Sequence, residues 1–321
     1  MLSRRSFALS LLFCAAAAPA RAGEPDFQAW IQGVRRDALA QGIAAATLDR
    51  ALAGVAPIPR VIELDHRQPE TTLSFSEYLE RVVSPQRRQA ARERLQENRA
   101  LLDAVGARFG VPPRFIVALW GIETDFGRVT GNFPVIDALA TLAFEGRRAA
   151  FFRRELISAL MIVDRQHIDP HRMTGSWAGA MGQSQFMPSS FLTYAVSYRG
   201  EAAPDIWNRR DDVFASIANY LARVGWRSEE GWGDSVRLPS GLDPASESQL
   251  KPVGAWAALG VRRVDGSPLG ERAGAAGLVA PQGAEGPIFL VYDNYRALLK
   301  WNNSSYFAIS VGYLADSMTR R

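Results

Sequence analysis

The 321-residue chain is long enough to bury a sizeable core, as one large domain or as two to three smaller lobes. Its 47% hydrophobic and 22% charged residues are ordinary for a soluble globular protein and exclude a chain dominated by disorder. The formal net charge is +4, and the sequence contains no strong basic stripe or stacking motif. Composition and charge therefore argue against a nucleic-acid-binding protein.

The first 22 residues have the organisation of an export signal. Two adjacent arginines precede an apolar run over residues 8–18, which is too short for a permanent membrane span, and residues 20–22 offer a small-x-small cleavage site. Residues 3–7 also resemble the twin-arginine export motif, although paired arginines occur in many ordinary signals. We expect a periplasmic protein with no stable membrane span that begins near Gly23.

Cys14 is the only cysteine and lies inside this signal. Lipidation of Cys14 is an open alternative, but Phe13 is a poor residue to precede a lipidated cysteine, so we favour a soluble product. The mature chain would then form no disulfide and no thiolate metal site. Loss of the signal removes three arginines and no acidic residue, so the mature net charge falls to about +1.

The rest of the chain predicts a mainly α (α+β) protein. We expect a helical N-terminal lobe over 23–105, a central core over 106–230, a small β-containing insertion over 231–287 and a C-terminal segment over 288–321 that returns to the core. The arginine-rich run over 85–105 is interpreted as the solvated face of an amphipathic helix. Helical patterns cover Phe27–Ala40, Pro134–Phe144, Ala149–Gln166, Asp211–Val224 and Tyr306–Met318, and strand patterns cover Ser235–Leu238, Gly277–Ala280 and Ile288–Tyr292.

Glu123 is the strongest candidate for a reactive group. Helical periodicity places Ile116, Leu119 and Trp120 on the same face as its carboxyl group, and Gly127 predicts the end of that helix just beyond. A carboxylate in an apolar stripe loses hydration, which should raise its pKa and let it hold a proton near neutral pH. A general acid requires this property.

The segment Trp177–Ser190 combines small residues with amide and aromatic side chains, which suits a groove where a sugar polymer lies close to the backbone. Several ordered blocks of the chain resemble the membrane-bound lytic murein transglycosylase B family. The blocks are Glu123–Gly127, Ile136–Phe144, Gly179–Ser189 and Trp301–Phe307. The resemblance covers nearly all of the mature chain.

The resemblance implies a lysozyme-like core and an enzyme, a peptidoglycan lytic transglycosylase of the lyase class. The family cleaves the β-1,4 bond between N-acetylmuramic acid and N-acetylglucosamine without water and forms 1,6-anhydromuramic acid ends. It uses one glutamate as acid and then as base, and Glu123 matches that residue. A single carboxylate is sufficient because the muramic 6-hydroxyl of the substrate is the nucleophile.

The resemblance also assigns substrate-binding positions. Ser176 and Gln185 should offer hydrogen bonds to acetamido or hydroxyl groups, and Phe186 should line the same cleft. Arg147 and Arg148 match an arginine pair that contacts the peptide stem, whose carboxylates guanidinium groups can grip. A plain surface arginine pair is an equally good interpretation.

Four residues match further cleft positions, namely Tyr220, Trp301, Asn302 and Phe307. Trp301 and Phe307 stand where tyrosines are frequent in the family, so stacking on sugar rings should survive while hydroxyl hydrogen bonds are lost. For each aromatic residue, packing in the core is at least as good an interpretation until a cleft is seen.

Asp125 is interpreted as a helix-end or structural residue, because residues two apart on a helix point to different sides. For Glu123, the structural alternative is a buried glutamate paired with an arginine such as Arg128. Two alternative functions stay open. One is a hydrolytic muramidase in which Asp125 or another acid positions water, and the other is a catalytically inactive peptidoglycan-binding scaffold.

No metal and no other cofactor is predicted. Some family members carry a calcium loop resembling an EF-hand, but the corresponding stretch over 197–205 has Arg199 and Ala203 at ligand positions. The histidines are interpreted as surface or loop residues and are His66, His167 and His171. We expect a monomer whose partners are peptidoglycan glycan strands and other cell-wall enzymes, with no nucleic acid.

Overall fold

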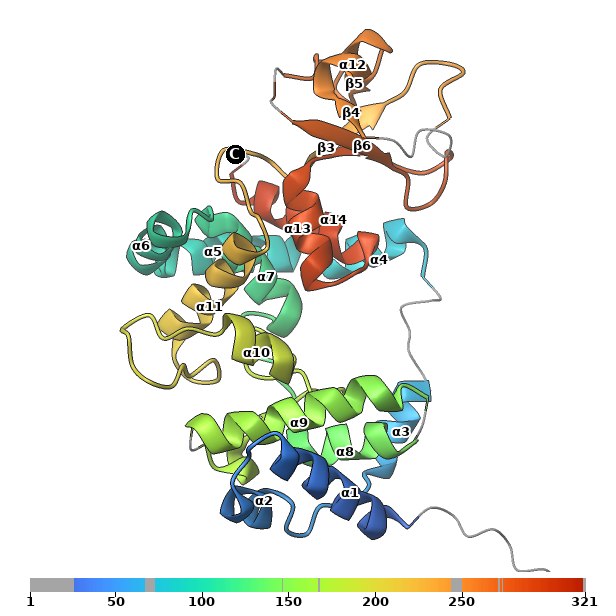
Figure 1. The fold of residues 1–321 in the computed structure, drawn as a ribbon. Coiled ribbons are helices and arrows are strands. Elements are labelled where there is room, and N and C mark those ends of the chain that lie inside the picture. Colours follow the sequence, from blue (N-terminus) through green and yellow to red (C-terminus); the bar gives the residue numbers. More distant parts are fainter. Residues whose placement is uncertain are drawn as a thin grey trace, which may run out of the picture.

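The computed structural model describes residues 26–66, 73–145, 147–166, 168–243, 250–270, 272 and 274–319. The predicted signal, with Cys14, and His167 lie outside these residues. Helices make up most of the described chain, and small antiparallel sheets accompany them, which confirms the predicted mainly α class (Figure 1). No described helix is both long and apolar enough to cross a membrane.

Helices from two distant parts of the chain form the lower helical group of Figure 1. The N-terminal helices of this group pack on α8 and α9 and bury a common apolar core. Hydrogen bonds also join the N-terminal helices to α8 and α9. The Thr47 hydroxyl donates to Asp164 at 2.6 Å, and the Ile58 N–H donates to the Thr141 hydroxyl at 2.9 Å. The group comprises α1 (Phe27–Ala40), α2 (Ala45–Ala51), α3 (Pro59–His66), α8 (Val135–Glu145) and α9 (Ala149–Gln166).

A second group of helices surrounds α7 (Pro113–Thr124), whose residues from Phe115 to Gly121 are all buried. Pro113 suits the first turn of α7, since a helix leaves the N–H at that position without an intrahelical partner. The neighbours of α7 are α5 (Pro85–Glu97), α6 (Arg99–Phe109), α11 (Arg210–Arg223) and α14 (Ser305–Ser317). Because α6 packs on both α7 and α11, contacts continue across residue 105, and the lobe boundary there stays a prediction.

Shorter elements complete this part of the chain. The strands β1 and β2 pair antiparallel, and α4 packs on α14 while α10 packs between α9 and α11. These elements are α4 (Phe75–Val82), β1 (Phe133–Pro134), a single turn of 3-10 helix (Pro170–Arg172), β2 (Thr174–Gly175), α10 (Pro188–Tyr194) and α13 (Asp293–Trp301).

The insertion forms an antiparallel five-stranded sheet in the order β4-β6-β7-β3-β5, at the top of Figure 1. Trp256 on α12 is fully buried in a separate apolar cluster, so the insertion has a core of its own. The three predicted strands correspond to β3, β6 and β7. Because β7 pairs with β3 and β6, the sheet continues past residue 287, where the insertion was predicted to end, and α13 and α14 then pack on the helices. The elements are β3 (Gly233–Arg237), β4 (Lys251–Pro252), α12 (Val253–Ala258), β5 (Arg262–Arg263), β6 (Ala275–Val279) and β7 (Ile288–Val291).

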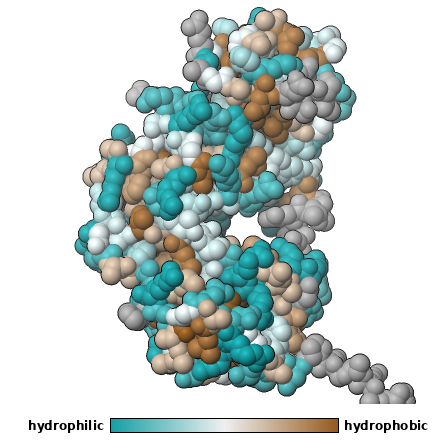
Figure 2. All heavy atoms as spheres, in the orientation of Figure 1, coloured by the Kyte–Doolittle hydropathy of each residue, from teal (hydrophilic) through white to brown (hydrophobic). Residues whose placement is uncertain are grey.

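The molecular surface is hollowed between the lower helical group and the body above it (Figure 2). The helix α7 runs toward this hollow, and the connection between α13 and α14 lies on the same side (Figure 1). The hollow therefore separates two helical bodies, and Glu123 in the last turn of α7 is partly exposed to solvent.

Candidate active site

Glu123 lies in the last turn of α7 and is partly exposed. The helix ends because Asp125, Phe126 and Gly127 all have positive φ angles, of 51°, 61° and 82°. The Asp125 N–H bonds to the Gly121 carbonyl at 3.0 Å, so the reversed chain satisfies orphan carbonyls of the helix. This abrupt end puts the Glu123 carboxyl at the tip of an otherwise buried helix.

The carboxyl group of Glu123 is held by an indole from the other end of the chain. The Trp301 Nε1–H, at the end of α13, donates to Glu123 Oε1 at 2.6 Å. An indole N–H can only donate, so Oε1 acts as an acceptor in this contact. In a protonated Glu123 the carbonyl oxygen is the stronger acceptor, so we expect Oε1 to take that role and Oε2 to carry the proton.

Three predicted cleft aromatics form one cluster around this contact. The ring centroids of Trp301 lie 5.2 Å from Phe186 and 4.7 Å from Tyr220. Phe186 and Tyr220 are only 2% and 7% exposed, so both support Trp301 from beneath. Phe307 is buried in the core as well, at 5% exposed, while Asn302 caps α13 next to Trp301 and stays partly exposed.

The Tyr220 hydroxyl is part of the support and is not a proton source near neutral pH. It donates to the Lys300 carbonyl at 2.5 Å, one residue before Trp301. Burial, with a smaller contribution from Tyr194, raises the pKa of Tyr220 to about 12. Tyr220 thereby fixes the end of α13, and with it the direction of the Trp301 indole.

The loop over 174–187 contributes the predicted polar groups. Ser176 Oγ accepts from the Ala180 N–H at 3.1 Å, which leaves its hydroxyl hydrogen to donate. Gln185 adopts a φ of 48°, and its Nε2 donates to the carbonyls of Thr130 and Gly182 at 3.1 and 3.0 Å. The Gln185 Oε1 is thus left as the acceptor of that amide.

Gln183 joins this loop to α7, a role that the sequence reasoning missed. Its Oε1 accepts from Trp120 Nε1 at 2.9 Å, and its backbone carbonyl accepts from the Thr124 hydroxyl at 2.9 Å. A Cβ at Gly127 would lie 2.4 Å from the same Oε1, so only glycine fits there. The Gln183 amide within the small-residue segment 182–184 was the only sequence signal for this role, and it does not identify partners as distant in sequence as Trp120 and Thr124.

Arg147 and Arg148 lie between α8 and α9 in the lower helical group. They bind Asp65 at 2.6 and 3.0 Å, and Asp65 is only 4% exposed. Burial alone would raise the pKa of Asp65, but hydrogen bonds and charge from the two arginines outweigh it and lower that pKa. Both guanidinium groups are about half exposed, so a role toward a peptide stem stays a prediction.

Asp125 is a helix-end residue, as predicted. It occupies the left-handed position that ends α7, and its carboxylate pairs with Arg128 and with Arg87 at 3.7 Å. The arginine suggested as a partner of Glu123 is therefore engaged by Asp125.

The stretch that corresponds to a calcium loop is organised by arginines. Arg199 binds Asp211 at 2.7 Å, and Arg209 binds Glu201 and Asp211. Asp212 accepts backbone N–H groups of the loop, including that of Tyr198 at 2.7 Å. Within the described ranges, no three His, Cys, Asp or Glu side chains are grouped so that they could hold a metal ion.

Comparisons with known proteins all find transglycosylases. A family model described as "Transglycosylase SLT domain" matches residues 26–316. The membrane-bound lytic murein transglycosylase B of Escherichia coli (strain K12) is 35% identical over 215 residues, which cover 65% of this chain and 58% of that relative. The chain therefore spans less than two thirds of that relative's length.

Solved structures agree with the sequence match. SltB3 from Pseudomonas aeruginosa, in complex with NAG-anhNAM-pentapeptide, superposes with a TM-score of 0.87 at 45% identity, over 92% of this chain and 80% of that chain. The soluble lytic transglycosylase SltB1 from the same organism superposes with a TM-score of 0.78 at 29% identity, over 92% and 99% of the two chains. The predicted lysozyme-like fold is confirmed by these neighbours. This chain belongs to the transglycosylase SLT domain family.

Proposed function

We propose that the protein is a peptidoglycan lytic transglycosylase. It cleaves the β-1,4 bond between N-acetylmuramic acid and N-acetylglucosamine and leaves 1,6-anhydromuramic acid ends. Family membership supports the substrate class, and one contact carries the mechanism. That contact is the donor-only indole N–H of Trp301 on Oε1 of Glu123, at 2.6 Å.

In the first step, Glu123 acts as a general acid. The proton on Oε2 moves to the glycosidic oxygen, the bond from the muramic C1 to that oxygen breaks, and the N-acetylglucosamine leaves as an alcohol. The C1 centre becomes oxocarbenium-like while Glu123 becomes a carboxylate. The Trp301 N–H then bonds to a charged oxygen, which strengthens a hydrogen bond already in place.

In the second step, the same carboxylate acts as a base. The muramic 6-hydroxyl attacks C1, its proton passes to Glu123, and a second C–O bond closes the anhydro ring. The acid is thereby regenerated and no water is consumed. Asp125 takes no part, because its backbone ends α7 and its carboxylate pairs with arginines.

The polar groups of the 174–187 loop would hold the sugars. The Ser176 hydroxyl can donate to an acetamido or hydroxyl oxygen of the sugar, and Gln185 Oε1 can accept from an N–H or O–H group. Asn302 lies beside Trp301. Phe186, Tyr220 and Phe307 act through packing. For an exported protein, this activity would lie in the periplasm and would require no cofactor.

The experiment compares the wild type with Glu123→Gln, which keeps the shape and an acceptor for Trp301 but cannot cycle a proton. The wild type should release soluble muropeptides from purified sacculi, and the variant should release none while it still sediments with them. A variant that releases muropeptides at the wild-type rate would refute the assignment of Glu123. A wild type that binds sacculi and releases nothing would indicate a scaffold.

A further inference from the structure

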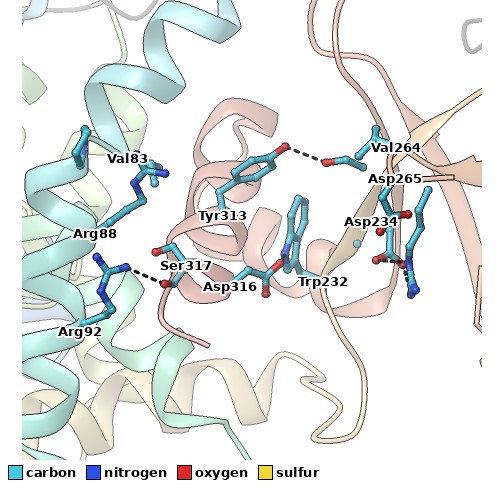
Figure 3. Close-up of a pocket in the computed structure, with 14 residues that line it drawn as sticks. Val83, Arg88, Arg92, Trp232, Asp234, Val264, Asp265, Tyr313, Asp316 and Ser317 are labelled. Atoms are coloured by element: carbon cyan, nitrogen blue, oxygen red, sulfur yellow. Dashed lines mark hydrogen bonds and ion pairs between the residues drawn. The ribbon is translucent and has the colours of Figure 1, made fainter. Parts of the chain in front are cut away.

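A cavity of about 830 Å³ lies where α5, the β insertion and the end of α14 meet (Figure 3). This volume is within the range of small-ligand sites. The walls come from three segments that are distant in the sequence. The residues that matter are Arg88 and Arg92 on α5, Trp232 before β3, Asp265 after β5, and Tyr313 and Asp316 on α14.

The cavity is separate from the Glu123 site. Trp301, which holds Glu123, precedes the first turn of α14, whereas Asp316 lies in its last turn. The rise of an α-helix puts about 16 Å between Ser305 and Asp316 along the axis. A ligand in the cavity would therefore not touch the reacting bond.

The α5 wall presents two arginines to the cavity that form no ion pair within the described part of the chain. Among the described residues, Arg88 has no ion-pair partner, and Arg92 donates only to the Ser317 carbonyl and the Gln89 amide, at 3.1 and 3.0 Å. Other arginines of α5 do have acidic partners, such as Arg94 with Glu97 at 2.5 Å. Two guanidinium groups one helical turn apart form a natural site for a carboxylate.

The parts of the cavity lined by α14 and by the insertion are acidic and aromatic (Figure 3). Asp265 accepts both the N–H and the hydroxyl of Ser267, at 2.9 and 2.6 Å, and these bonds lower its pKa and keep it charged. Asp316 accepts from Trp232 Nε1 at 3.0 Å, and the Tyr313 ring lies 5.9 Å from Trp232. These parts of the cavity can take an ammonium group and stack against an apolar chain.

We propose that the cavity binds a peptide segment that carries a carboxylate and an ammonium group. The carboxylate lies on Arg88 and Arg92, and the ammonium group lies toward Asp265 and Asp316. This inference rests on the proposed function, because the peptide stems of peptidoglycan have this chemistry. The cavity would then hold a stem while Glu123 acts on the glycan.

The test measures binding of a synthetic, sugar-free stem peptide with free carboxylates and one free amine to the full chain, by calorimetry or by amide chemical shifts. An Arg88→Ala, Arg92→Ala variant should bind at least about tenfold more weakly, since charge-assisted hydrogen bonds are lost. The matched control is Arg94→Ala with Arg99→Ala, which removes the same charge from exposed arginines outside the cavity and should bind as the wild type does.

Equal binding by both variants, or no binding by the wild type at millimolar peptide, would overturn the proposal. The wild type should bind a peptide with amidated carboxylates as weakly as the arginine variant binds the unmodified peptide. Equal binding of the two peptides by the wild type would also refute the proposal. The probe contains no glycosidic bond, so its binding is measured independently of cleavage. Failure of the proposed function would instead appear as intact sacculi in the wild-type digest, whatever the peptide binds.

Discussion

Trp301→Phe tests whether the indole N–H contributes to catalysis. The substitution removes the 2.6 Å bond to Glu123 Oε1 and keeps an aromatic ring against Phe186 and Tyr220. A neutral hydrogen bond is worth about 0.5–1.5 kcal/mol and a charged one about 1.5–3 kcal/mol. Only this difference, about 1–1.5 kcal/mol, lowers the barrier as Glu123 becomes a carboxylate.

The expected result is a fall in kcat of roughly 5- to 13-fold with little change in KM. The assay is the initial rate of cleavage of soluble glycan strands, with Tm measured on the same samples. Trp256→Phe is the matched control, because it removes an indole N–H that donates to the Ala276 carbonyl at 2.9 Å in the insertion. The control should lower Tm and leave kcat unchanged. A Trp301→Phe enzyme with wild-type kcat would refute the reasoning.

Three further substitutions test the surroundings of the site. Asp125→Asn should cost less than about 1 kcal/mol of stability and leave kcat within twofold, whereas a loss of cleavage in glycan assays would restore Asp125 as a second acid. Gly127→Ala places a Cβ 2.4 Å from Gln183 Oε1 at a φ of 82°, so the free energy of unfolding, measured with denaturant, should fall by roughly 1–3 kcal/mol. A variant as stable as the wild type would contradict this contact. Arg147→Ala should cost roughly 1–2 kcal/mol at pH 7. The pKa of Asp65 is lowered in the folded state, so its ion pair with Arg147 stabilises the fold above the ordinary Asp pKa of 3.8, and this stabilisation is lost as the pH falls below that value. The free energies of unfolding of the wild type and the variant should therefore converge in acid.

Local patterns predicted the elements but not the contacts between distant ones. The α7 helix, its end at Asp125 and the strand at 288–292 follow from proline, glycine and side-chain periodicity. The Glu123–Trp301 bond joins residues 178 positions apart, and no periodicity relates them. The family resemblance predicted Trp301 in the cleft, but only the three-dimensional structure shows that its indole N–H donates to Glu123 Oε1.

The same limit applies to contacts elsewhere in the chain. The sequence offered Arg147 and Arg148 both as contacts to a ligand and as a plain arginine pair, and only the fold reveals Asp65, more than 80 positions earlier, between them. The cavity between α5 and the insertion likewise depends on three segments that meet only in the folded chain. The aromatic residues predicted in the cleft differ in burial, which the residue type alone does not reveal: Trp301 reaches Glu123, while Phe186 and Phe307 are buried.

The most direct test of the account is mass spectrometry of the muropeptides released from sacculi by the wild-type protein. If Glu123 activates the muramic 6-hydroxyl, every new muramic end should be an anhydro end, lighter by one water than the hydrolysed product. New reducing ends that take up isotopic oxygen from labelled water would contradict the account and show that water is the nucleophile.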